Sequence, residues 1–394
     1  MIDLSEAATR RRTEGLAPPD ASSDGLAALD ARMLWSALTE PGDGVAGTLI
    51  AALGPREALE FALGDPAGLS PATLAPSGGQ GLRAARERWR RRSGDAVHAA
   101  DAARRAGVTP VTPEHPAWPA AVDDLGPHAP LCLWVRGSTP ALSADRPALA
   151  LVGARAATAY GEDVVTGLAA DLGGGGVTIV SGGAYGIDGM AHRAALAAGA
   201  VTVAWLAGGV DRAYPSGHRG LLDAIVAAGG AVAAEVPCGS APTKWRFLAR
   251  NRLIAAASDA TVVVEAGWRS GSLNTAGHAA ALGRPLGAVP GPVTSAASAG
   301  CHRLLREYDA QCITSSDDAR ELLGWREQPG DGVPSTDPEV SRVGDALSTR
   351  SARSSSDIAR RSGVDLDVVE STLGLLALEG AVRRGPDGWR AVPR

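Results

Sequence analysis

The chain has 394 residues, of which 45% are hydrophobic and 21% charged, and its formal net charge is −5 at pH 7. This length allows two or three domains, and the negative charge excludes a protein coated in positive charge, so any nucleic-acid contact has to be a local patch. The four cysteines are far apart and form no CxxC or Cys/His pair, which argues against a disulfide scaffold or a zinc site and favours a cytoplasmic protein.

The first part of the chain is predicted to be helical. Residues 1–24 are polar and are expected to form a flexible N-terminus without the apolar region of a signal peptide. Residues 25–110 are expected to form a helical module, because apolar residues recur at helical spacing in the segments 26–38, 45–54 and 56–63. A further helix at 82–94 is strongly basic, which is typical either of a solvated arginine face or of a nucleic-acid contact.

The middle of the chain, residues 111–325, alternates buried strands with helices. Short apolar runs are each followed by a turn of small residues, and most of these turns lead into an amphipathic helix. The runs are ALALVGAR, GVTIVSGG, AVTVAWLAGG, GAVAAEVP, DATVVVEAG and PLGAVPG. This alternation predicts an α/β domain with a doubly wound, mainly parallel sheet, whose site is formed by the loops at the strand C-termini. No apolar stretch is long enough to suggest a membrane span.

The last part of the chain has the pattern of a winged helix. Residues 326–340 have the composition of a linker, and 341–394 are predicted to contain three helices followed by a β-hairpin. Some winged-helix domains bind DNA, and others bind protein partners. The sequence does not decide between these two roles.

The first strand of the middle domain ends in a turn that suits a phosphate better than a dinucleotide. The stretch VGARAATAYG is not a GxGxxG motif, and the second strand ends in SGG rather than in an acidic residue. NAD binding is therefore disfavoured, and we expect no cofactor. The helix that follows would offer free N–H groups next to Arg155, an arrangement suited to an anion.

A second turn, SGGAYGIDGMAH, begins with Ser181, Gly182 and Gly183. Asp188 and His192 are four residues apart and could form an acid/base pair. Because no nucleophile or metal ligand accompanies them, we favour structural roles, with Asp188 capping the helix and His192 bonding to a neighbouring loop.

A third turn places Ser270, Gly271 and Ser272 at a helix start, where amides and hydroxyls suit a phosphate oxygen. Several such helix starts along one sheet edge fit an extended nucleic-acid backbone better than one mononucleotide.

The stretch TKWRFLARNR, residues 243–252, contains Lys244, the sole lysine of the chain, and Phe247, one of two phenylalanines. A lysine suits a phosphate as a point charge, and an aromatic ring suits a nucleic-acid base. The alternative is that Phe247 belongs to the core and that Lys244 has no special role.

Taken together, these motifs resemble the DprA/Smf DNA-processing family from about Pro113 to Leu323. The resemblance lies in VGARxxxxYG, SGGAYGIDxxAH, GGVDxxYP, FLARNRLIAAAS, VVVEAGWRSGSLNTA and the PG loop. It implies an extended Rossmann-like domain that binds single-stranded DNA, preceded by a helical module of the SAM or helix-hairpin-helix type and followed by a winged-helix-like domain. It also implies a binding site made of the residues Arg155, Ser181, Gly182, Gly183, Lys244, Phe247, Arg250, Asn251 and Arg252. We add Ser270, Gly271 and Ser272 to this site because of their position at a helix start.

Such proteins are not enzymes. They protect incoming single strands during natural transformation, help to load a RecA-type recombinase and typically form homodimers. Small departures, such as VGAR for VG-S/T-R, leave the charged and aromatic positions in place. One alternative is a nucleotide or nucleoside-phosphate hydrolase on a related sheet, although its PGGxGTxxE motif is absent. Another is a regulatory protein that reads its target with the winged helix.

Overall fold

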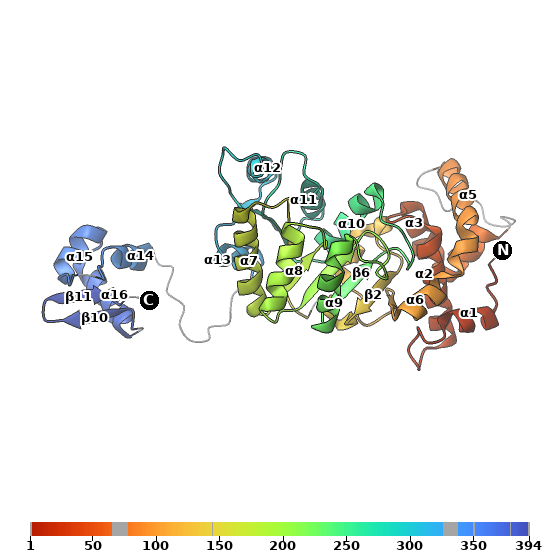
Figure 1. The fold of residues 1–394 in the computed structure, drawn as a ribbon, viewed down its shortest axis with the longest axis horizontal. Helices are drawn as coiled ribbons and strands as arrows, with labels where there is room; N and C mark the ends of the chain where they lie inside the picture. The colour runs from red at the N-terminus through yellow and green to blue at the C-terminus, as the bar shows by residue number, and fades with distance from the viewer. Residues whose placement is uncertain are drawn as a thin grey trace. The chain divides into compact units, whose positions relative to one another are not determined.

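A nine-stranded sheet forms the centre of residues 1–325 in the computed structural model (Figure 1). The structure describes residues 2–64, 78–143, 145–325, 338–349, 351–378 and 380–392. The chain divides into two units, residues 1–325 and 326–394, which are described separately below. Most of the linker expected at 326–340, namely 326–337, lies outside the described residues. No helix in the described ranges combines the length and the apolar character needed to cross a bilayer.

The sheet confirms the predicted α/β architecture. The apolar runs form parallel strands at its centre, and two short antiparallel strands extend one edge. In chain order the strands are β1 (Thr109–Val111), β2 (Leu133–Gly137), β3 (Ala148–Val152), β4 (Thr178–Ser181), β5 (Thr202–Leu206), β6 (Ala231–Ala234), β7 (Ala260–Val263), β8 (Leu286–Ala288) and β9 (Gln311–Cys312). Their spatial order is β1-β2-β6-β5-β4-β3-β7-β8-β9, so the direction of winding reverses between β3 and β7. In doubly wound sheets, a ligand crevice opens at this reversal.

Helices cover both faces of the sheet because successive side chains of a buried strand point in opposite directions. On β3, Leu149 and Leu151 belong to the hydrophobic core built with α7 and α8, whereas Ala150 and Val152 belong to the core built with α10 and α11. The helices of this region are α7 (Ala159–Gly174), α8 (Ile187–Ala197), α9 (Arg219–Ala227), α10 (Lys244–Ala256), α11 (Ser272–Ala281), α12 (Ala299–Glu307) and α13 (Ser316–Leu322). Short 3₁₀ segments span Ala120–His128, Thr139–Leu142 and Ser216–His218.

The helical module precedes the sheet and packs around its own core. Its helices are α1 (Glu6–Thr13), α2 (Ser23–Leu38), α3 (Gly44–Leu53), α4 (Pro55–Leu63), α5 (Gly78–Ala96) and α6 (Ala99–Ala106). Trp35 of α2 and Trp89 of α5 meet edge to face at the centre of this core, with ring centroids 4.9 Å apart.

The expectation of a flexible N-terminus is wrong for α1. Arg12 holds the buried carboxylate of Asp30 with two hydrogen bonds of 2.6 and 2.7 Å, and the hydroxyl of Thr9 donates to the same carboxylate. A buried carboxylate needs such partners, and they fix α1 against α2.

The unit of residues 326–394 contains the three helices and the hairpin that the sequence predicts. They are α14 (Pro338–Asp345), α15 (Ser355–Ser362), α16 (Leu366–Leu378), β10 (Val382–Gly385) and β11 (Gly388–Ala391). Ser354 caps α15 by accepting the Asp357 N–H, and the two strands pair antiparallel.

Candidate nucleic-acid interface

An open cleft of about 900 Å³ lies at the carboxyl ends of the central strands, where the winding of the sheet reverses. The loops after β3, β4, β5, β7 and β8 contribute to its walls together with α10. Charged, aromatic and hydroxyl side chains line it, among them Arg155, Asp188, Tyr214, Lys244, Phe247, Arg250, Arg269, Ser270 and Ser272. The crevice expected from the topology is therefore present, and its lining combines apolar residues with polar and positively charged ones.

One face of α10 forms a wall of this cleft. The helix begins after Thr243, whose side chain accepts the Arg246 N–H as an N-cap. Lys244, Phe247, Asn251 and Ile254 all line the cleft. Their spacing of three, four and three residues places them on one face of a helix. The stretch of residues 243–252 thus presents both Lys244 and Phe247 to the cleft.

The cleft holds three exposed cations that are not neutralised by carboxylates within the described residues. Among the residues that the structure describes, Arg155, Lys244 and Arg269 line the cleft and form no ion pair. All three are exposed, and they come from three separate elements. Free cations spread along a groove suit a chain of phosphates better than a single anion.

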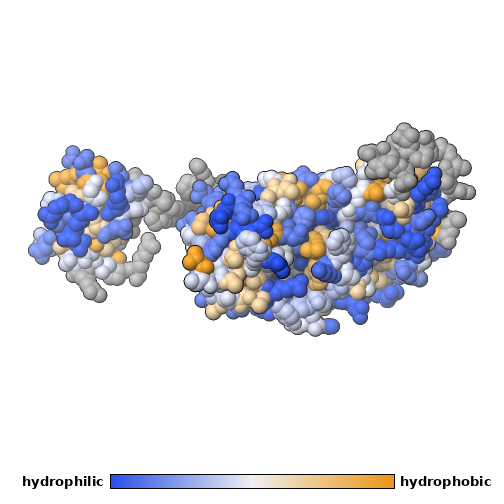
Figure 2. Space-filling view, turned by 90° about the horizontal axis from the view of Figure 1, so that it is seen from above, coloured by the Kyte–Doolittle hydropathy of each residue, from blue (hydrophilic) through white to orange (hydrophobic). Residues whose placement is uncertain are grey.

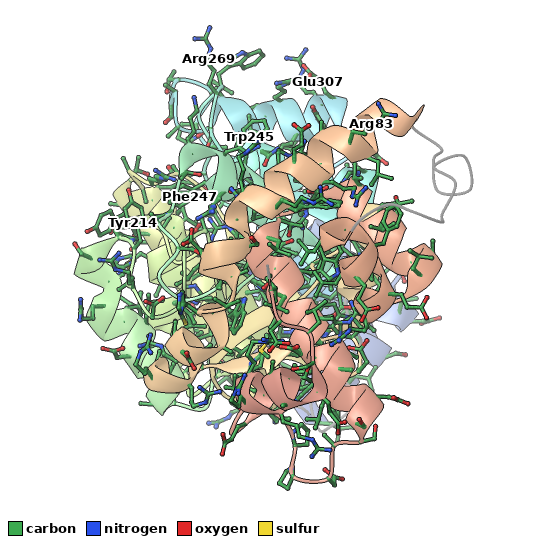
Figure 3. The ribbon with its side chains drawn as sticks, turned by 90° about the vertical axis from the view of Figure 1, so that its right-hand side faces the viewer. Arg83, Tyr214, Trp245, Phe247, Arg269 and Glu307 are labelled. Atoms are coloured by element: carbon green, nitrogen blue, oxygen red, sulfur yellow. The ribbon has the colours of Figure 1, made fainter. Side chains whose placement is uncertain are left out.

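Phe247 lies between a second ring and an arginine. The ring of Tyr214 is 5.5 Å from that of Phe247 at an angle of 56°. The guanidinium carbon of Arg155 lies 5.0 Å from the centroid of the Phe247 ring, within the range of a cation–π contact. Figure 3 shows Tyr214 and Phe247 on the same side of the molecule, with Arg269 farther along. Phe247 is only partly buried, so it is not a core residue.

The RNR element, residues 250–252, mainly holds together the elements around the cleft. Arg250 is buried and donates to the carbonyl of Gly182 at 2.6 Å and to that of Trp205. Burial lowers the pKa of Arg250 to about 10, with Asp188 acting in the opposite direction, so the side chain stays charged at neutral pH. The amide of Asn251 donates to the Gly271 carbonyl at 3.3 Å. These two residues connect α10 to the loops on either side of it.

Arg252 does not reach the cleft. Its guanidinium forms two 2.8 Å hydrogen bonds to the carboxylate of Glu235 and also donates to the carbonyl of His128. Both partners of the ion pair are buried, with side chains 7% and 9% exposed. The structure therefore separates Arg252 from the other predicted site residues.

The second predicted loop lies behind the cleft. Ser181 is fully buried and donates to the Leu151 carbonyl, and the Gly183 carbonyl bonds to His218. A Cβ on Gly182 would lie 2.6 Å from both Arg250 Nη1 and Asp188 Oδ2, so a larger residue there would displace these two buried side chains. These three residues support the cleft from behind and do not line it.

The structure provides no acid/base pair in this loop. Asp188 accepts the Ala184 N–H, and burial raises the pKa of its carboxyl, with Arg250 opposing that shift. His192 bonds through Nδ1 to the Thr202 hydroxyl on a neighbouring strand, and burial lowers its pKa to about 3. The structural role preferred for His192 is confirmed, although its partner is a strand residue and not a loop.

Of the helix starts expected to bind phosphate, that of α11 faces the cleft, whereas that of α7 already holds a carboxylate of the protein. Ser270 and Ser272 line the cleft, with their hydroxyls 2.7 Å apart. At the start of α7, in contrast, the buried carboxylate of Glu265 accepts both the N–H and the hydroxyl of Thr158. The expectation of an anion site on the amides of α7 is wrong, because the protein supplies its own anion there.

Tyr214 and Arg269 line the cleft without being among the predicted site residues. Tyr214 lies in the motif GGVDxxYP, which in the sequence supports only the family resemblance. Arg269 lies within VVVEAGWRSGSLNTA, directly before the predicted Ser270. A useful signal is their position, since both lie in loops that follow the strands β5 and β7.

Comparisons with known proteins agree on one family. The profile of DNA recombination-mediator protein A matches residues 109–324. DprA of Mycobacterium tuberculosis (strain H37Rv) is 45% identical over 305 residues, covering 73% of this chain and 78% of the relative. Smf of Escherichia coli (strain K12) is 34% identical over 279 residues, covering 67% and 72%.

Two solved structures are similar over long stretches. The X-ray structure of DprA from Streptococcus pneumoniae has a TM-score of 0.60 at 29% identity and covers 75% of this chain and 97% of its own. A structure of DprA from Helicobacter pylori, which describes the single-stranded DNA binding mode of that protein, has a TM-score of 0.50 at 31% identity and covers 56% and 99%. The chain belongs to the DprA/Smf family of DNA recombination-mediator proteins.

Proposed function

We propose that this protein binds single-stranded DNA in the cleft without sequence preference. The observation that carries the proposal is the combination of three unpaired cations and two neighbouring rings in one open cleft. Arg155, Lys244 and Arg269 neutralise phosphates, and Phe247 with Tyr214 offers a ring surface on which bases stack. Stacking tolerates every base, which accounts for binding without sequence readout.

Single strands are favoured over duplexes for a geometric reason. The faces of bases in a duplex are covered by their neighbours, whereas an unpaired base can turn its face toward Phe247. The cations lie on the loop after β3, on α10 and on the loop after β7, so they fit a flexible backbone that passes over several strand ends.

The protein acts as a binding protein and not as an enzyme. Asp188 is the one carboxylate among the described lining residues, and it is buried, which raises its pKa. Within the described part of the chain, no cluster of three or more His, Cys, Asp or Glu side chains could hold a metal ion. Glu265 occupies the helix start where a nucleotide phosphate would bind, which argues against the nucleotide-hydrolase alternative.

In the cell, the protein protects incoming single strands and helps a RecA-type recombinase to assemble on them in the cytoplasm. Membership of a recombination-mediator family supports this role, and we expect a homodimer as the active form. The recombinase step is testable by adding the protein to a RecA-type ATPase assay on single strands coated with a single-strand-binding protein. A mediator shortens the lag, and an unchanged lag would argue against this part of the proposal.

Fluorescence anisotropy with labelled oligo-dT tests the binding itself. We expect tighter binding to oligo-dT than to a duplex of equal length, and an affinity that falls steeply with salt as bound counterions are released. A duplex that binds as tightly as the single strand, or turnover of any member of a nucleotide panel, would overturn the proposal.

A further inference from the structure

A second, smaller groove of about 470 Å³ lies beside α5 in the helical module. Its lining residues are Leu38, Thr39, Glu40, Pro41, Gly42, Asp43, Arg88, Trp89, Arg91 and Arg92. It is outside the region matched by the family profile, which begins at residue 109. The sequence predicts a strongly basic helix here, and the described lining of the cleft at the sheet contains none of its arginines.

The arginines of α5 divide into an engaged set and an available set. Arg86 and Arg90 donate to main-chain carbonyls, and Arg92 binds Glu40 and the Thr39 carbonyl. Arg91 is exposed and forms no hydrogen bond or ion pair within the described residues. Arg88 is half exposed and forms a long ion pair with Asp43, with the two atoms 3.9 Å apart. Arg91 is thus free to bind an anion, and Arg88 is held by one long contact only.

The two acidic residues of the groove are already engaged. Glu40 accepts hydrogen bonds from both Arg92 and Arg246, so two arginines neutralise its charge. Asp43 accepts from the N–H groups of Val45 and Ala46 and from the indole N–H of Trp89. Neither carboxylate therefore cancels the charge of Arg91.

The groove is connected to the cleft through the first turn of α10. Arg246, which shares Glu40 with Arg92, lies two residues after the cleft lysine Lys244. Between them is Trp245, whose side chain is 73% exposed and has no ring partner or hydrogen bond within the described ranges. In Figure 3, Trp245 lies between Phe247 and Arg83, which is a residue of α5. Seen from the side of α10, α11 and α12, the surface shows small apolar patches among hydrophilic residues (Figure 2).

We propose that single-stranded DNA leaving the cleft crosses Trp245 and continues into the groove beside α5, where Arg88 and Arg91 bind its phosphates. An exposed indole between two cationic grooves offers a stacking surface for one base, as aromatic side chains do in single-strand channels. Charge and shape favour the same ligand in both grooves, so the binding site extends from the sheet onto the helical module. This inference rests on the proposed single-strand binding by the cleft.

Oligonucleotide length separates the two grooves experimentally. The full chain is titrated with a short oligo-dT of about six nucleotides, near the lower end of single-strand site sizes, and a long one of about 20, above their upper end. We expect Arg88→Gln/Arg91→Gln to bind the short oligonucleotide as wild type does and the long one about tenfold more weakly at low salt. The salt slope for the long oligonucleotide should fall by about 1.4, since each phosphate contact contributes about 0.7. Trp245→Ala should lose at least about fivefold on the long oligonucleotide only.

The matched control is Arg11→Gln/Arg105→Gln, which removes the same charge from α1 and α6, at the opposite edge of the module from α5 in Figure 1. It should bind both lengths as wild type does. Equal affinity of wild type and Arg88→Gln/Arg91→Gln for the long oligonucleotide would overturn the inference, and so would equal losses at both lengths. Failure of wild type to bind either length would instead overturn the proposed function.

Discussion

At the scale of single residues, the structure separates side chains that face the cleft from side chains that are buried behind it. Phe247 is partly exposed between Tyr214 and Arg155, whereas Arg252, five residues later, is buried against Glu235. Both belong to the same helix and the same motif, yet their environments are opposite. Substitutions at the two positions should therefore change different measured quantities.

Phe247→Ala should weaken oligo-dT binding by about 1–3 kcal/mol, the value of one stacked base, and leave the salt slope unchanged because no charge is removed. Phe247→Tyr keeps the ring and should bind as wild type does. The measurement is anisotropy at several salt concentrations. Wild-type affinity in Phe247→Ala would show that no base stacks on this ring.

Arg252→Gln should lower the free energy of unfolding by about 3–5 kcal/mol, because it leaves the buried carboxylate of Glu235 without its partner. Urea unfolding followed by circular dichroism measures this loss. The salt slope of DNA binding by the folded variant should match that of wild type, since Arg252 lies outside the cleft. A reduced slope with unchanged stability would show that Arg252 contacts phosphate.

At the scale of elements, Glu40 connects the helical module to α10, the helix that forms one wall of the cleft. It accepts hydrogen bonds from Arg246 of α10 and Arg92 of α5. Burial tends to raise the pKa of Glu40, but the hydrogen bonds and charges of the two arginines outweigh it, so the pKa is lowered on folding. The stabilisation is therefore present above the pKa of the unfolded chain and is lost as the pH falls through the lower folded-state pKa.

Glu40→Gln tests this connection. Melting temperatures measured from neutral to acidic pH should fall less steeply for Glu40→Gln than for wild type, because one titrating group with a depressed pKa is removed. At neutral pH the variant should melt below wild type by a small amount, since Glu40 is partly exposed to solvent. Parallel curves for the two proteins would contradict the assigned role of Glu40.

At the scale of the whole molecule, all described lining residues of the cleft belong to the unit of residues 1–325. Removing residues 326–394 should leave the affinity for oligo-dT within about twofold of the full chain, because every proposed phosphate and base contact lies in residues 1–325. Anisotropy of the shortened chain provides the test. A loss of tenfold or more would assign DNA binding to the winged-helix-like unit.

The sequence predicted the sheet well because buried parallel strands are continuous apolar runs between small-residue turns, as in β3 and β7. It predicted the cleft residues Lys244 and Phe247 from their chemistry and their motif. It could not distinguish Arg252 from a DNA contact, because its partner Glu235 meets it only in the folded chain. The same reason applies to α1, whose order depends on the buried carboxylate of Asp30 on another helix.

The anion expected at the start of α7 illustrates the limit of such reasoning. The start of α7 does hold a negative charge, as the sequence predicts. Glu265, more than a hundred residues later in the chain, supplies that charge. Sequence patterns show what a segment can bind, and tertiary structure decides whether the protein itself occupies the place.

The most direct test of the account is the salt dependence of oligo-dT binding by wild type and Lys244→Ala, with Lys244→Arg as the control that keeps the charge. Lys244 is exposed in the cleft and has no ion pair within the described residues, so we expect Lys244→Ala to bind more weakly and its salt slope to fall by about 0.7. Lys244→Arg should keep the wild-type slope. If Lys244→Ala binds with the affinity and the slope of wild type, the cleft is not the site of single-stranded DNA binding.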